Sequence, residues 1–98
     1  MLKIQSTTSF SRVVKKMHDK DKRLVDEAVE AISSDLASGE EKNGDLSGVF
    51  VYRFKMNKQN VLLAYKYEVS KFNPEEIILL AIGSRENFYE YLKNEVHA

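Results

Sequence analysis

Residues 44–67 contain two stretches in which the side chains alternate between two faces, and this alternation limits what the chain can fold into. Four large apolar side chains share one face of residues 49–56, and the other face holds two valines together with Arg53 and Lys55. Residues 61–68 alternate in the same way. A period of two is that of a β-strand, and the residues between the stretches are enough for a hairpin turn. The sequence therefore predicts an antiparallel hairpin with two cations in its first strand.

Apolar stripes at helical spacing predict two helices before this hairpin. The first stripe lies within residues 9–18, and the second extends from Leu24 to Leu36. Residues 40–48 are rich in turn-forming residues, so the helical period ends before them. The expected boundary residues are Thr8 or Ser9 as the first N-cap, Asp19 as the second N-cap, Gly39 as a left-handed helix end, and Gly83 as the end of the last strand.

Two further strands and a last helix complete the predicted order β-α-α-β-β-β-α. Residues 2–5 alternate as a short strand, and the unbroken apolar run 77–82 is typical of a strand buried on both faces. Ser84 can cap a final helix. Because the strand faces are too apolar to stay exposed, helices must cover one of them. The predicted fold is α+β: a small, mainly antiparallel sheet with two N-terminal helices packed on one face and a short C-terminal helix.

Length and composition narrow the class of protein. The 98 residues fit a single domain over residues 1–98. The chain has no cysteine and only two histidines, far apart, so neither a metal site nor a cofactor is expected. No apolar run approaches the roughly 20 residues of a membrane span, and the N-terminal segment lacks the apolar core of a signal peptide. The chain is therefore expected in the cytoplasm.

The charges are unevenly distributed, although the net charge is zero. Residues 1–23 contain seven Lys or Arg against two acids, and residues 46–71 contain five against one. Residues 24–45 contain seven acids against one base. A balanced total argues against a general nucleic-acid coating protein. The expectation is a local basic face on one part of the surface.

Arg53 and Lys55 are the first candidates for function. They are two residues apart in one strand, so their side chains leave the same face about 7 Å apart, close to one nucleotide step. Guanidinium groups suit phosphate because they present several donors in a fixed fork, and a nearby tyrosine can orient a ribose hydroxyl. The other candidates are Lys66 in the next strand, Arg85 after the apolar strand, and Tyr89 and Tyr91 soon afterwards.

Each of these residues also has an ordinary structural explanation. Charged side chains are common on the solvent side of an antiparallel sheet, so Arg53 and Lys55 also fit a solvated face. The tyrosines of the strands fit core or cross-strand packing. Tyr89 and Tyr91 could simply dock the last helix. The residues alone leave both explanations open.

Three segments taken in order, GDLSGVFVYRFKM, VLLAYKYE and IILLAIGSRENFY, resemble the RelE/ParE superfamily of toxins from type II toxin–antitoxin systems. The resemblance covers nearly the whole chain, and its specificity lies in the ordered set. Within that superfamily, the RelE and YafQ branch cuts mRNA in the ribosomal A site without metal. The ParE branch poisons DNA gyrase and is not a nuclease. The resemblance favours the RelE-like branch for this chain.

The resemblance assigns catalytic roles to four positions. Arg53 and Lys55 match two basic residues of the RelE-type strand. Arg85 matches the basic residue that follows the glycine of the fourth strand. Tyr89 is the best match to a late tyrosine, and Tyr91 is the second choice, as an RNA-binding residue.

One position departs from the RelE pattern. RelE-type enzymes have an arginine early in the strand after the basic pair, on the same face, and this chain has Leu62 there. Lys58 or Lys66 could substitute as an RNA-binding residue, but neither is in register. The low overall charge is a second departure, since these toxins are usually basic.

The resemblance also implies a reaction and partners. The ribose 2′-hydroxyl would attack the adjacent phosphate, with Arg53 and Arg85 stabilising the transition state. Lys55 would hold the backbone or help withdraw the proton. The implied partners are a cognate antitoxin, the ribosome and mRNA, with no membrane. Two alternatives remain: a non-enzymatic inhibitor of DNA gyrase, and an inactive member that only binds a partner.

Overall fold

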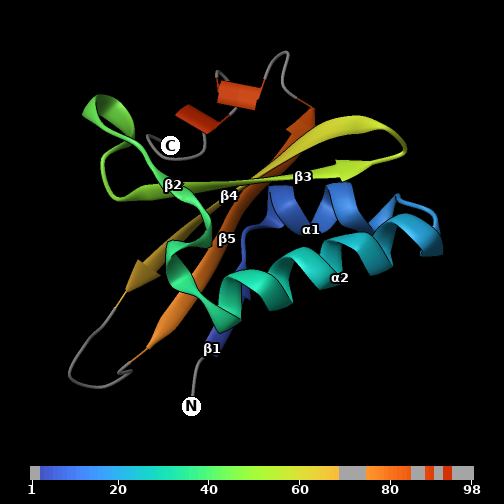
Figure 1. The fold of residues 1–98 in the computed structure, drawn as a ribbon, viewed down its shortest axis with the longest axis horizontal. Helices are drawn as coiled ribbons and strands as arrows, with labels where there is room; N and C mark the ends of the chain where they lie inside the picture. The colour runs from blue at the N-terminus through green and yellow to red at the C-terminus, as the bar shows by residue number, and fades with distance from the viewer. Residues whose placement is uncertain (1–2, 69–74, 85–87, 90–91, 94–98) are drawn as a thin grey trace.

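The computed structural model describes residues 3–68, 75–84, 88–89 and 92–93 (Figure 1). The elements, in chain order, are β1 (Lys3–Ser6), α1 (Thr8–Lys15), α2 (Asp19–Ser34), the 3-10 turn η1 (Leu36–Ser38), β2 (Glu40–Glu41), the 3-10 turn η2 (Gly44–Leu46), β3 (Val49–Met56), β4 (Gln59–Glu68) and β5 (Glu76–Ser84). The strands form a five-stranded sheet in the order β1-β5-β4-β3-β2. β1 is parallel to β5, and the other neighbours are antiparallel. The predicted α+β class with a mainly antiparallel sheet is confirmed.

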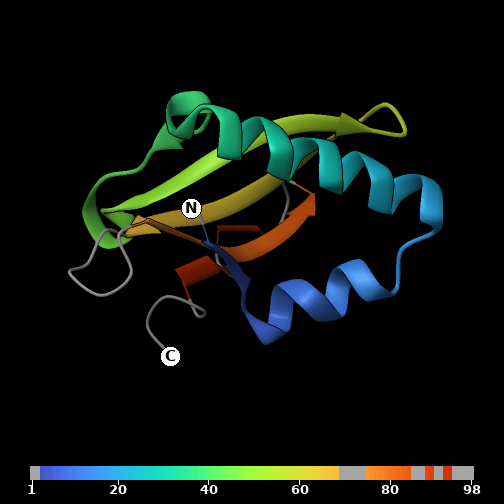
Figure 2. The same ribbon diagram turned by 90° about the horizontal axis from the view of Figure 1, so that it is seen from below.

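Both helices pack on one face of the sheet, as predicted (Figure 1). Phe10 of α1 and Ile32 of α2 are buried with Leu63 and Tyr65 of β4 in one apolar core. Figure 2 shows the short connection between the helices near the β3–β4 hairpin. The first turn of α2 is linked to the hairpin by a hydrogen bond of 3.2 Å, which the side chain of Asn57 donates to the carboxylate of Asp21.

The first helix is capped by Thr7, so the prediction of Thr8 or Ser9 is wrong by one or two residues. The Thr7 hydroxyl oxygen accepts a hydrogen bond from the backbone N–H of Phe10 at 3.2 Å. The same hydroxyl donates to the carbonyl of Leu80 in β5 at 2.8 Å. One side chain therefore starts α1 and fixes it to β5.

The second helix ends at Ser34, so the predicted end at Gly39 is wrong. Gly39 has φ −90° and ψ 159°, which is extended backbone. The predicted cap Asp19 is the first helical residue, and His18 occupies the N-cap position without a side-chain hydrogen bond. Glycine is needed at position 39 for space, because a Cβ there would lie 2.6 Å from the phenol oxygen of Tyr65.

The β3–β4 hairpin is tighter than predicted. Met56 pairs with Gln59, so the connection is only the two residues Asn57 and Lys58. Both have positive φ, 53° and 67°, as a type I′ turn requires. The predicted four-residue connection, residues 57–60, is wrong because Gln59 and Asn60 are paired with β3 and belong to β4.

The alternation predicted for the hairpin is confirmed. The helix-covered face of β3 carries Phe50, Tyr52, Phe54 and Met56. The opposite face carries Val49 and Val51, which are buried in a second core with Leu62, Ala64, Leu80, Ala81, Leu46, Phe88 and Leu92. β5 contributes to both cores, as its apolar run predicts. The predicted break at Gly83 is wrong, since β5 continues to Ser84 and Gly83 pairs with Leu62.

Two other segments differ from the sequence prediction. Residues 40–48 were expected to be turns throughout, but Glu40 and Glu41 form β2 and pair with Val51 and Phe50. The predicted C-terminal helix lies partly outside the described residues. Of that segment, residues 88–89 and 92–93 have helical backbone, and they lie on the side of the sheet opposite α1 and α2 (Figure 1).

Among the helices of the described residues, none combines the length and apolar character that crossing a membrane requires.

Candidate functional site

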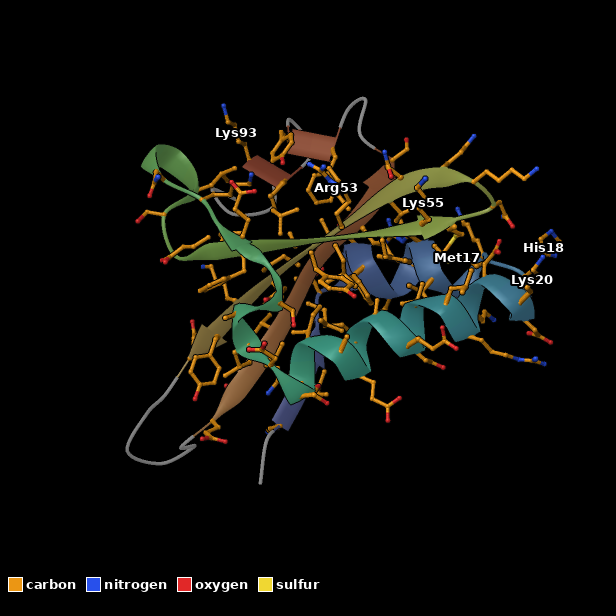
Figure 3. The ribbon with its side chains drawn as sticks, in the orientation of Figure 1. Met17, His18, Lys20, Arg53, Lys55 and Lys93 are labelled. Atoms are coloured by element: carbon orange, nitrogen blue, oxygen red, sulfur yellow. The ribbon has the colours of Figure 1, made fainter. Side chains whose placement is uncertain are left out.

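Arg53 and Lys55 lie in the half of β3 that extends beyond the short edge strand. β2 pairs with β3 only at Val51 and Phe50. Beyond that point the described strands pair with β3 on the β4 side alone, and both cationic side chains are exposed. Figure 3 shows Arg53 and Lys55 on the side of β3 that faces away from the helices. The predicted cationic pair is therefore accessible to a ligand.

A hollow of about 250 Å³ lies beside Arg53, between β2, β3 and the C-terminal segment. Its lining residues are Ser38, Glu40, Lys42, Val51, Arg53 and Tyr89. Two of the predicted catalytic residues, Arg53 and Tyr89, thus come together although 36 positions separate them in the sequence. Among the described residues, the lining combines two cations, one carboxylate, one phenol, one hydroxyl and one valine.

Glu40 and Lys42 reach this hollow because of β2. They are two residues apart in extended chain, so their side chains leave the same face. The backbone N–H of Lys42 donates to the carbonyl of Val49 at 2.9 Å, which extends the pairing with β3 by one step. The Lys42 ammonium lies 3.6 Å from a carboxylate oxygen of Glu40 and 5.5 Å from the centre of the Tyr89 ring. Carboxylate, ammonium and aromatic ring therefore form a continuous chain of contacts.

The other predicted cations lie elsewhere. Lys66 pairs with Val49, four positions along the strand from the register of Arg53, which is about 13 Å at the β-strand rise. Lys58 is at the tip of the hairpin. Lys55 borders a different hollow of about 140 Å³, between β3 and α2, together with Leu24, Glu27, Ala28, Tyr52 and Phe54. These three lysines all belong to the described residues, and none of them lines the hollow beside Arg53.

Two predicted site residues, Arg85 and Tyr91, lie outside the described residues. The position that departs from the RelE pattern, Leu62, is described and is 1% exposed. It pairs directly with Arg53 across β3 and β4. Its side chain belongs to the second core, so an arginine could not replace it there without burying a charge.

Sequence reasoning missed three residues of the hollow: Ser38, Glu40 and Lys42. All three lie in or beside the segment expected to turn. The available signal was the spacing of Glu40 and Lys42 by two, which places an acid and a base on one face if the segment is extended. Without β2, that spacing has no structural meaning.

The described residues contain no cluster of three or more His, Cys, Asp or Glu side chains that could hold a metal ion. The side chains of the hollow offer several kinds of contact. Arg53 and Lys42 can bind an anion, Glu40 can accept a proton, and Tyr89 can donate or accept a hydrogen bond. This combination suits a phosphodiester with a neighbouring hydroxyl.

Comparisons with known proteins agree with this fold. The sequence profile of a family described as "ParE-like toxin of type II bacterial toxin-antitoxin system" matches residues 4–93. A chain in the crystal structure of the toxin–antitoxin complex RelBE2 from Mycobacterium tuberculosis is similar, with a TM-score of 0.64 and 20% sequence identity. The alignment covers 85% of this chain and 96% of that chain. A search of curated proteins found no significant match.

The fold and the matched profile define the class: a toxin of the RelE/ParE superfamily. More particularly, the chain belongs to the ParE-like toxin family of type II bacterial toxin–antitoxin systems.

Proposed function

We propose that this toxin is a ribosome-dependent mRNA endonuclease that inhibits translation by cutting in the A site. The observation that carries the proposal is the hollow in which Arg53, Glu40 and Tyr89 meet. It contains a cation that can bind a phosphate, a carboxylate that can accept a proton from a hydroxyl, and a phenol that can hydrogen-bond to one. Attack by a ribose hydroxyl on a phosphodiester uses both kinds of group.

The reaction is attack by a ribose 2′-oxygen on the adjacent phosphorus, in line with the bond to the 5′-oxygen. The new bond closes a 2′,3′-cyclic phosphate, and the old bond breaks to give a 5′-hydroxyl. The 2′-hydroxyl loses a proton and the departing 5′-oxygen gains one. The ribosome would hold the codon in the required geometry, which lowers the entropic part of the barrier.

Three residues of the hollow and two others have roles in this proposal. Arg53, with Arg85 from the segment after β5, stabilises the negative charge that grows on the phosphate oxygens. Glu40 accepts the proton of the 2′-hydroxyl, and Tyr89 orients that hydroxyl by a hydrogen bond. Lys55, further along β3, holds the RNA backbone outside the hollow. No metal or cofactor takes part in these steps.

A cognate antitoxin is the proposed protein partner. Membership of a type II toxin family supports it, and the similar RelBE2 structure is a toxin–antitoxin complex. An antitoxin segment that covers the hollow or the exposed cations of β3 would block access of RNA. The expected complex therefore lacks nuclease activity.

The test is to express the toxin briefly without its antitoxin and to sequence the 5′ ends of cellular mRNA. Cuts that fall at a constant position within codons, and that disappear when translation is blocked, are expected. A reaction with purified ribosomes and one defined mRNA should give the same cuts. Intact mRNA in both experiments, with growth arrested, would exclude the nuclease. Normal growth would indicate an inactive member.

Inhibition of DNA gyrase is the second candidate function, and two observations favour it. Leu62 is buried opposite Arg53, where RelE-type enzymes carry an arginine, so the cationic face is smaller than in that branch. The matched profile is also described as ParE-like. Purified gyrase treated with the toxin would then accumulate broken DNA, while mRNA stays intact.

A further inference from the structure

The hollow has a second cation that the resemblance does not assign. Arg53 reaches the hollow from β3, and Leu62 on the β4 side supplies no charge. Lys42 reaches it from the opposite neighbour, β2, and lines the same cavity. Lys42 thus supplies a positive charge from one side of β3, where Leu62 supplies none from the other side.

Lys42 is held in place while part of it stays open to solvent. Its backbone is fixed to Val49 by a hydrogen bond of 2.9 Å. Its side chain is 24% exposed, against 76% for its ion-pair partner Glu40. A lysine that only decorates the surface would extend into water, whereas this ammonium lies 5.5 Å from the Tyr89 ring centre. The side chain therefore lies along the wall of the hollow, between Glu40 and Tyr89.

The contacts of Lys42 leave its capacity to bind an anion free. An ammonium has three N–H donors. The distance of 3.6 Å to Glu40 is an ion pair and is longer than a hydrogen bond, and the ring of Tyr89 takes no conventional hydrogen bond. Donors therefore remain for a phosphate. Glu40 and Tyr89 orient the lysine without consuming those donors.

We propose that Lys42 is a phosphate-binding residue that contacts the RNA strand next to the phosphate bound by Arg53. Arg53 enters the hollow from β3, and Lys42 enters it from the position after β2. The backbone of Lys42 is hydrogen-bonded to Val49, four positions before Arg53 in β3. With both side chains extended, they can hold neighbouring phosphates of a single strand. This inference rests on the proposed function, since it names a further contact of the same site.

The test measures binding to a short single-stranded RNA with 2′-O-methyl groups, which cannot be cut. Fluorescence anisotropy at several KCl concentrations gives the slope of log K against log salt. Each phosphate contact contributes about 0.7 to that slope for a single strand. The Lys42→Met variant should lower the slope by about 0.7, and Lys42→Gln should do the same. Lys42→Arg should keep the wild-type slope.

The matched control is Lys15→Met, since Lys15 is an exposed lysine at the end of α1. Its slope should equal that of the wild type. An unchanged slope for Lys42→Met, an equal loss for Lys15→Met, or no salt-dependent binding by the wild type would overturn the proposal. Because the probe is uncleavable, absence of mRNA cutting on ribosomes would refute the proposed function and leave this result standing.

Discussion

The backbone N–H of Gly39 donates a hydrogen bond of 3.0 Å to the phenol oxygen of Tyr65, which in turn donates to the carbonyl of Leu36 at 2.9 Å. Tyr65 is fully buried and stacks on Phe50 at a centroid distance of 5.4 Å. One hydroxyl thus joins the centre of β4 to the segment between α2 and β2. Since β2 presents Glu40 and Lys42 to the hollow, the Tyr65 hydroxyl supports the candidate site from the opposite face of the sheet.

Replacing Tyr65 with Phe should destabilise the protein by about 1–3 kcal/mol. The ring packing is kept, but the N–H of Gly39 loses its partner inside the fold, and leaving a buried donor unpaired carries that cost. Urea unfolding measures the change. The control is Tyr67→Phe, because the Tyr67 side chain is only half buried and should cost much less. Equal losses in the two variants would contradict the role given to the Tyr65 hydroxyl.

Replacing Gly39 with Ala should also destabilise the protein, because the new Cβ would lie 2.6 Å from the Tyr65 oxygen and 2.8 Å from its Cε1. Tyr65 cannot move aside since it is fully buried. Overpacking of this kind costs about 1–3 kcal/mol. In the Tyr65→Phe background the closest clash is gone, so the same alanine should cost less. Strictly additive losses in this double-mutant cycle would show that the two residues are not coupled.

The stability of the protein should fall at alkaline pH partly through Tyr65. Burial raises the pKa of the Tyr65 phenol, the hydrogen bond from Gly39 lowers it, and the charge of Asp35 raises it, so that it lies above the ordinary value near 10. A folded-state pKa above the unfolded one favours the protonated folded form. That contribution is complete below pH 10 and is lost as the pH rises through the raised pKa.

The measurement is the free energy of unfolding of wild type and Tyr65→Phe between pH 8 and pH 11, at roughly half-unit steps. Other tyrosines and lysines titrate in both proteins, so the difference between the two isolates Tyr65. The advantage of the wild type should shrink only above about pH 10. A difference that stays constant across this range would mean that the phenol titrates normally in the folded state.

The parts of the fold that the sequence predicts well depend on strong periodicity. The alternation around Arg53 assigned each side chain of β3 to its face, and the apolar run 77–82 was correctly predicted as a strand buried on both faces. The failures concern residues whose role is set by distant partners. The sequence around Gly39 predicts a helix end, but the glycine is required because Tyr65 occupies the space that a Cβ would need.

The candidate site shows the same limit. Arg53 was identified because a cation in an apolar strand stands out in the sequence. Glu40 and Lys42 were missed because a two-residue strand has no pattern of its own. Glu40 is extended through the pairing of β2 with β3, and Lys42 is fixed by the hydrogen bond to Val49. A local signal cannot predict an element that exists through a tertiary contact.

Replacing Arg53 with Gln should lower mRNA cleavage on ribosomes by about 10²–10³, since the guanidinium stabilises charge that develops on the phosphate. Folding should be unaffected because the side chain is exposed. Arg12→Gln is the matched control, because Arg12 is an exposed arginine on α1. Single-turnover cleavage rates decide the matter, and a rate for Arg53→Gln within a factor of two or so of the control would remove Arg53 from the site.

Replacing Glu40 with Gln should lower the cleavage rate by about 10²–10⁴, the usual contribution of a general base. The neighbouring Glu41→Gln is an internal control, because Glu41 is the adjacent residue of β2 and its side chain leaves the opposite face. Both substitutions remove one negative charge from the same strand, so a purely electrostatic effect would be similar in the two. Single-turnover cleavage on ribosomes measures both variants, and the loss should be confined to Glu40→Gln. A Glu40→Gln rate equal to that of Glu41→Gln would assign the proton to another group.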